Sequence, residues 1–364
     1  MTKQLTVLSP IAACALIALA ARPAHAWDAG PKECTTNACS GGVQNSKSSI
    51  KIGGHEQKMR GNTHLYIVKN ALELLAKDPD PIAKEVAKAV NGCSPHWEQG
   101  LFDGDEPPLS ETGGAMGTHF YNATIPDPMK AGYAVGPNGV WDKREEIKKI
   151  PGQDVQGNAT KQVTYDGKIF NTTKRGNARD HAHDNLTAVG GTDKASRIAK
   201  LTNPVACKHL GLALHYMTDM TQPMHSSSFS AIDRSPGATM AGNTIALHGA
   251  FEYYVPVVQQ KTSSKNMTWD HRMKTMPADD AFQDAASRGN RQAPGLWKLL
   301  TEKKSPTCKF SFGDLADYNG YCFAGDPAVD AYVGNMLADA FQSTAGYLYS
   351  AIAMPSQVVK STKN

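Results

Sequence analysis

The sequence lacks a strong excess of either charge, and it contains no Cys-x-x-Cys pair. Lysine and arginine number 38 against 34 acidic residues in a chain of 364, whereas dedicated nucleic-acid-binding domains are usually strongly basic. This balance argues against a nucleic-acid-binding protein. Because closely spaced cysteine pairs are typical of thiolate zinc sites, their absence disfavours a zinc site built from cysteine.

The sequence also has no internal repeat, and little of the apolar–polar alternation that marks strands. Apolar residues recur instead at helical spacing, which predicts helices over 62–77, 81–90, 203–220, 245–257, 278–300 and 330–353. Gly, Pro, Asn and Lys are frequent in 123–180 and 301–328, which predicts long surface loops with one hairpin near Val163 to Ile169. We therefore expect an all-α, multi-helix single domain with a polar tail over 355–364.

Residues 1–26 have the features of a secretory signal peptide. Lys3 supplies a positive start, the stretch from Ile11 to Ala21 is apolar, and Ala24-His25-Ala26 has the small-x-small form of a cleavage site. The apolar stretch is short for a membrane span. We expect cleavage after Ala26, export to the periplasm or the medium, and a mature domain over 27–364 that begins with Trp27.

The cysteines beyond the leader are even in number, as expected for disulfides in an exported protein. Sequence alone leaves several pairings open. Proximity favours Cys34–Cys39 and Cys308–Cys322, which leaves Cys93–Cys207 to join two helical segments.

Two pairs of ionisable residues are the most informative pattern in the chain. His215 and Asp219 lie four residues apart, and His248 and Glu252 repeat the spacing, so each pair shares one helix face and can reach one metal ion. His225 follows just beyond Pro223, which should kink or end the first helix. A single histidine on an apolar face is more often a core residue. Two pairs in apolar sequence favour a centre with more than one metal ion, because a buried charge needs a partner.

Several segments resemble, in order, the bacterial zinc-dependent phospholipase C family, starting from an N-terminal Trp27. They are Asn-Thr-His64-Leu-Tyr-Ile-Val, Gly-Leu-Phe-Asp-Gly-Asp105, Gly-Thr-His119-Phe-Tyr, the segment from Leu210 to His225, and His248-Gly-Ala-Phe-Glu252. Ser343-Thr-Ala-Gly-Tyr347 is similar to part of the family's C-terminal helix. The resemblance covers most of 27–136 and 200–258 together with the final helix.

The resemblance implies an all-helical domain that holds three zinc ions in a cleft. One ion would take His119, His215 and Asp219, with Asp105 as a further ligand or as the catalytic base. The second would take His225, His248 and Glu252. The third would take the α-amino and carbonyl groups of Trp27, with His64 and with Asp219 as a bridge. Imidazole, carboxylate and a deprotonated amine are all suitable zinc ligands.

The implied activity is hydrolysis of phospholipids at a membrane surface by a monomer, with no nucleic-acid partner. Clustered zinc ions suit this reaction, because they acidify water and neutralise phosphate oxygens. Phosphatidylcholine is the expected substrate, and other headgroups stay open. The positions of Glu106, Met116 and Gly30 depart from the aromatic and acidic residues of the choline-preferring members, although Glu106 could still receive a cation.

Alternatives remain. Zinc-dependent single-strand nucleases share the fold and ligand order, but they typically end in His-xxx-Asp, whereas this chain has His248 and Glu252. A non-catalytic zinc-binding protein is a third class, disfavoured because no ligand position is missing.

The cluster over 180–184 would suit a metal, yet its composition favours a solvated loop. Trp141 or Tyr133 would contact the membrane.

Overall fold

A computed structural model of the chain describes residues 49–52, 55–58, 63–94, 96–104, 119–121, 123, 133–135, 141–143, 163–165, 168–170, 178–227, 232–233, 245–259, 261–304, 322–323 and 325–354. The predicted signal peptide and the tail from residue 355 lie outside these ranges.

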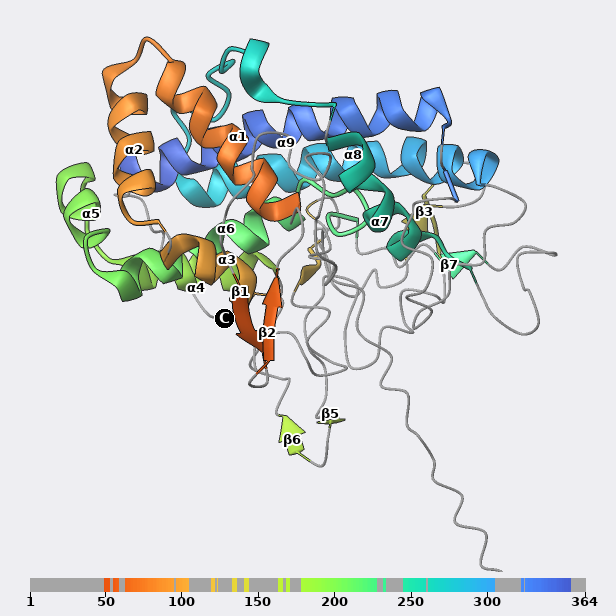
Figure 1. Cartoon of the computed structure of the whole chain (residues 1–364), viewed down its shortest axis with the longest axis horizontal. Helices are drawn as coiled ribbons and strands as arrows, with labels where there is room; N and C mark the ends of the chain where they lie inside the picture. The colour runs from red at the N-terminus through yellow and green to blue at the C-terminus, as the bar shows by residue number, and fades with distance from the viewer. Residues whose placement is uncertain are drawn as a thin grey trace, which may run out of the picture.

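Helices form the body of the described chain (Figure 1), which confirms the all-helical prediction. They are α1 (Thr63–Lys77), α2 (Pro81–Gly92), α3 (His96–Asp103), α4 (Ala178–Val189), α5 (Lys194–Lys200), α6 (Pro204–Asp219), α7 (Leu247–Gln259), α8 (Ala278–Lys303) and α9 (Pro327–Ala353), with the short 3₁₀ helix η5 (Ser264–Asn266). The six predicted helices are present with small shifts of their ends. The sequence did not predict α3, α4 or α5, and the solvated loop expected over 180–184 is wrong, because those residues lie in α4.

Strands occur in the described residues only as four separate antiparallel hairpins. They pair β1 (Ser49–Ile52) with β2 (His55–Lys58), β3 (Tyr133–Val135) with β4 (Trp141–Lys143), β5 (Val163–Tyr165) with β6 (Lys168–Phe170), and β7 (Ile232–Asp233) with β8 (Ile245–Ala246). The β5–β6 pair confirms the predicted hairpin. Of the helices described, none is both long and apolar enough to span a membrane.

Three helices begin with the same arrangement, an Asp or Asn cap followed by proline. The cap side chain accepts a hydrogen bond from a backbone N–H of the first turn, and proline fits the first helical position, where no N–H is needed. The pairs are Asp80–Pro81 for α2, Asn203–Pro204 for α6 and Asp326–Pro327 for α9. Local sequence therefore sets where these helices start.

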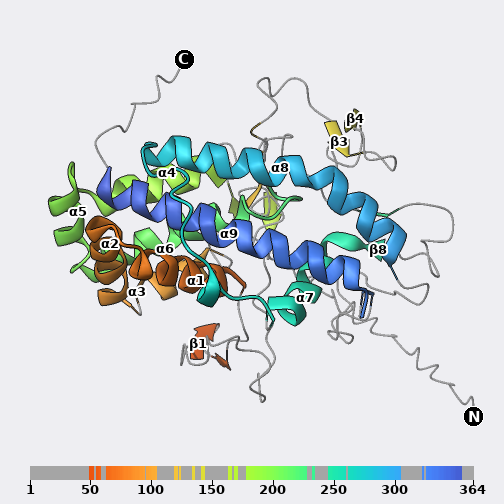
Figure 2. The same cartoon turned by 90° about the horizontal axis from the view of Figure 1, so that it is seen from above.

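Helix α9 is the central element, and seen from above it lies between α8 and α1 (Figure 2). Helices α3 and α6 cross at two glycines. A Cβ on Gly100 would lie 2.0 Å from the carbonyl oxygen of Lys208, and one on Gly211 would lie 2.0 Å from that of Trp97. A disulfide between Cys93 and Cys207 joins the end of α2 to α6 and confirms the predicted bond. Cys322 is also disulfide-bonded, whereas its expected partner Cys308 and the expected pair Cys34–Cys39 lie outside the described ranges.

Candidate metal centre

The carboxyl end of α6 organises the centre. The helix ends at Asp219, before Pro223, and residues 220–227 form tight turns. Backbone hydrogen bonds hold these turns, among them those from Gln222 N to Asp219 O at 2.9 Å and from Ser226 N to Gln222 O at 3.1 Å. As a result His225 is folded back beside the helix end, and the two predicted groups of ligands become neighbours.

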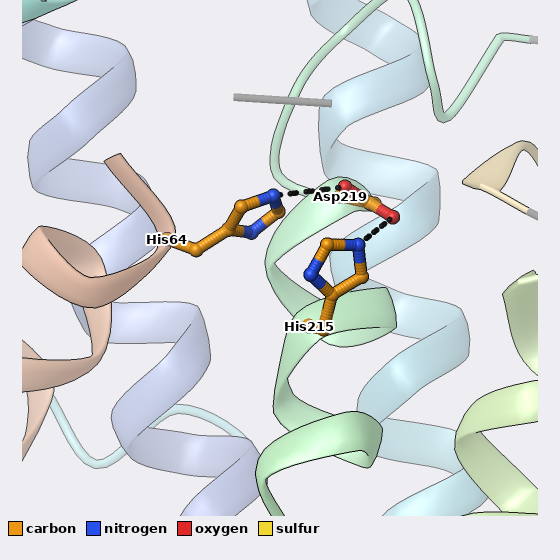
Figure 3. A group of neighbouring side chains, drawn as sticks. All are labelled: His64, His215 and Asp219. Atoms are coloured by element: carbon orange, nitrogen blue, oxygen red, sulfur yellow. Dashed lines mark ion pairs between the residues drawn. The ribbon is translucent and has the colours of Figure 1, made fainter. Parts of the chain in front are cut away.

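The first group joins α1 to α6 through Asp219 (Figure 3). His64 Nε2 lies 3.6 Å from Asp219 Oδ1, whereas His215 Nε2 lies 3.6 Å from Asp219 Oδ2. His119 Nδ1 is 3.0 Å from the same Oδ2 and 3.1 Å from His215 Nε2. The two carboxylate oxygens therefore face different histidines, which is the arrangement expected of a bridging ligand.

The residues of this group fit a zinc ion. Each of His64, His215 and Asp219 is fully buried, and their ligand atoms all lie within 4.8 Å of one another. Two ligands about 2.0–2.2 Å from one tetrahedral ion lie roughly 3.2–3.6 Å from each other. Each 3.6 Å separation, from a histidine nitrogen to the carboxylate oxygen that it faces, matches this spacing better than a hydrogen bond. A metal ion would also offset the cost of burying the carboxylate.

The second group combines His225 with the pair on α7. Glu252 Oε1 lies 2.8 Å from His248 Nε2 and 3.2 Å from His225 Nε2, and the two histidine nitrogens are 3.0 Å apart. Burial raises the pKa of Glu252, but the nearby His248 and His225 outweigh burial and lower that pKa to about 2. The carboxylate is therefore ionised at neutral pH and available to a cation.

Backbone carbonyls orient two of the rings. His215 Nδ1 lies 2.8 Å from Leu101 O, and His225 Nδ1 lies 2.8 Å from His119 O. A carbonyl only accepts hydrogen bonds, so each Nδ1 carries the proton and each Nε2 turns to its carboxylate. Metal-ligating histidines are commonly fixed in this way.

Gln222 adds a contact that the sequence did not predict. Its carbonyl oxygen accepts from the backbone N–H of Met224 at 2.5 Å and of His225 at 3.3 Å. This fixes the amide orientation, so its NH₂ group lies 3.1 Å from Glu252 Oε1 and 3.1 Å from His248 Nε2. The only sequence signal for Gln222 is its position between the predicted ligands Asp219 and His225.

The aromatic ring of Phe120 covers one side of the second group. The ring of Phe120 stacks on His225 with centroids 4.3 Å apart, and it meets His248 edge-on at 5.8 Å. Phe120 is itself buried. The ring excludes water from one side of the ligands, which strengthens electrostatic interactions there.

Of the predicted ligands, seven lie in the described part of the chain and are gathered into these two adjoining groups. Trp27 and Asp105 lie outside it, as do Gly30, Glu106 and Met116. The division of the ligands among three ions, and the roles of Trp27 and Asp105, stay predictions.

Curated relatives are named phospholipase C. One from Listeria monocytogenes serovar 1/2a is 24% identical over 243 residues, which are 66% of this chain and 64% of that protein. One from Bacillus cereus is 20% identical over 289 residues, 79% of each chain. The chain thus spans less than two thirds of the length of the Listeria relative.

A solved structure titled alpha toxin from Clostridium absonum aligns with a TM-score of 0.43 and 18% identity, over 80% of this chain and 62% of that one. No family model matches the chain. The two curated relatives confirm the resemblance to the bacterial phospholipase C family that the motifs indicated.

Proposed function

We propose that this chain, a relative of the bacterial phospholipases C, is itself a zinc-dependent phospholipase C. It hydrolyses the glycerol-side phosphodiester of phosphatidylcholine-type lipids to diacylglycerol and a phosphorylated headgroup. The observation that supports this most is the pair of buried ligand groups that meet at the end of α6. Relatives named for the same activity support it further.

The proposal includes three zinc ions at these two ligand groups. We assign to them His64, His119, His215, Asp219, His225, His248 and Glu252, completed by Trp27 and Asp105. Zinc, when bound, supplies Lewis acidity, which lowers the pKa of water and neutralises charge on phosphate oxygens. The chain holds the imidazoles in fixed tautomers and keeps Glu252 ionised.

Asp105 is the proposed link between the centre and the attacking water. It lies two residues beyond the end of α3, whose Leu101 carbonyl orients His215. We assign it as a further ligand or as the base that takes a proton from the water. The water oxygen bonds to phosphorus as the bond to the glycerol oxygen breaks, and that oxygen leaves with a proton as the alcohol of diacylglycerol.

Export and headgroup preference belong to the same proposal. Residues 1–26 act as a cleaved signal peptide, and the mature enzyme works as a monomer on a membrane surface outside the cytoplasm. Glu106 is the residue that would receive a cationic headgroup, beside Asp105 in the sequence. A set of vesicles that differ only in headgroup tests this assignment.

The decisive experiment tests the mature protein on two candidate substrates. Phosphatidylcholine vesicles and single-stranded DNA are incubated side by side, each with and without a zinc chelator. We expect release of phosphocholine that the chelator abolishes and that zinc restores, with DNA left intact. Cleaved DNA with intact lipid would assign the centre to the nuclease reaction instead. A His225→Ala protein is the control for contaminating activity.

A further inference from the structure

A single hydroxyl group connects His64 on α1 to the backbone of α6. Thr218 Oγ1 lies 2.6 Å from His64 Nδ1. Both residues are completely buried, and they lie 154 residues apart in the sequence. The contact therefore exists only in the folded chain, one residue before the shared carboxylate of Asp219.

The direction of this hydrogen bond follows from the other partners of the hydroxyl. Thr218 Oγ1 also lies 2.8 Å from Leu214 O and 2.9 Å from His215 O. Carbonyls only accept, and a hydroxyl has one proton to donate. Two carbonyls can receive that proton, which favours the arrangement in which the hydroxyl oxygen accepts from the Nδ1–H of His64.

We infer that Thr218 is a positioning residue, which fixes His64 in the tautomer that presents the Nε2 lone pair to a metal ion at Asp219. In a neutral imidazole only one nitrogen carries a proton. With that proton on Nδ1, Nε2 turns toward Asp219 Oδ1 at 3.6 Å. The inference rests on the proposed zinc centre and extends it to a residue that does not touch the ion.

His64 differs here from the two histidines whose rings the backbone orients. The carbonyls of Leu101 and His119 cannot be removed by substitution, whereas the hydroxyl of Thr218 can. A threonine bonded only to its own helix is common, and α8 contains one. Thr301 Oγ1 lies 2.9 Å from both Trp297 O and Lys298 O, and among the described residues it hydrogen-bonds no histidine. Thr301 is therefore the matched control.

The test uses the metal-free full-length mature protein with ¹⁵N-labelled histidine, at a pH above the ordinary histidine range. We expect the His64 ring signals of the Nδ1–H tautomer in the wild type and in Thr218→Ser. In Thr218→Val we expect that pattern to be lost, and Thr301→Val should leave it intact. A wild-type His64 in the Nε2–H form overturns the inference, even if the valine variant does not fold.

Zinc binding supplies the second measurement, by competition with a colorimetric chelator and zinc alone as the probe. We expect Thr218→Val to weaken one zinc equivalent by about 10–100-fold, as the loss of such partners does elsewhere. Thr218→Ser and Thr301→Val should bind as the wild type does. Equal affinity in Thr218→Val would overturn the inference. A wild type that binds zinc but hydrolyses no phospholipid would contradict the proposed function instead, while these two readouts still decide the role of Thr218.

Discussion

Gly104 lies against the ring of His215 with no room for a side chain. A Cβ at residue 104 would be 2.4 Å from His215 Cγ and 2.7 Å from its Nδ1. The ring cannot simply move away, because its Nδ1 is held by Leu101 O at 2.8 Å. The position of His215 in the first ligand group therefore depends on the tight turn after α3.

Gly104→Ala should consequently damage the centre and not only the turn. The added methyl displaces the ring of His215, and we expect zinc affinity and phospholipid hydrolysis to fall by about 10-fold or more. Zinc titration and vesicle hydrolysis check this. Gly92→Ala is the matched control, because nothing lies within 4 Å of a Cβ there, and it should keep both properties. Full zinc affinity in Gly104→Ala would contradict the prediction.

Asp80 should make stability depend on acid pH. Its partial burial raises its pKa, but Lys274, the N–H of Ile82 and the hydroxyl of Tyr349 outweigh burial and hold that pKa below the ordinary value. The folded pKa is thus lower than the unfolded pKa of about 3.9. The stabilisation is present in full above the unfolded value, and it is lost as the pH falls through the folded value.

Asp80→Ala should lower the free energy of unfolding by about 1–2 kcal/mol at neutral pH, since it removes a cap and an ion pair. The difference from wild type should shrink below a pH of about 4. Urea unfolding of the metal-free proteins at several pH values measures it. Asn203→Ala removes a cap that cannot titrate, so its cost should stay constant over the same range. A constant cost for Asp80→Ala would contradict the prediction.

The helices that the sequence did not predict show where local patterns fail. Gly100 lies within α3 and has a low helix propensity, yet the close crossing with α6 requires glycine there. In α4 most residues over 180–184 are polar, but Ala178, Ala182, Leu186 and Val189 form an apolar stripe at helical spacing. All four of these residues are buried. Tertiary packing therefore determines α3, whereas in α4 an apolar stripe at helical spacing outweighs the polar composition.

The candidate centre consists of the metal ligands and the groups that orient them, and the sequence predicts the ligands better than the orienting groups. The ligands His215, Asp219, His248 and Glu252 follow from helical spacing, because residues four apart share a face. The groups that orient them do not. Whether a threonine or a glutamine touches a histidine depends on how α1, α6 and α7 pack, and no local spacing encodes that.

Gln222 should hold the second group together. Gln222→Leu keeps most of the volume but removes the amide. The N–H groups of Met224 and His225 lose this acceptor, and Glu252 loses one donor. We expect zinc affinity at this group to fall by about 10–100-fold, measured by chelator competition. Gln342→Leu is the control, since among the described residues that buried amide hydrogen-bonds only backbone, from Thr268 O to Asp270 N. It should lower stability but leave zinc binding unchanged, and the same result for Gln222→Leu would contradict the assignment.

The free amino group of Trp27 should count as a ligand in the mature protein. An α-amine has an ordinary pKa near ~8, so a metal ion can displace its proton at neutral pH. One alanine placed ahead of Trp27 moves this amine away from the centre. We expect the bound zinc to fall by one equivalent and phospholipid hydrolysis to fall with it, as metal analysis and vesicle assays would measure. Replacing Trp27 by Phe with a free amino end should keep the zinc. An unchanged zinc content after the added alanine would remove Trp27 from the ligand set.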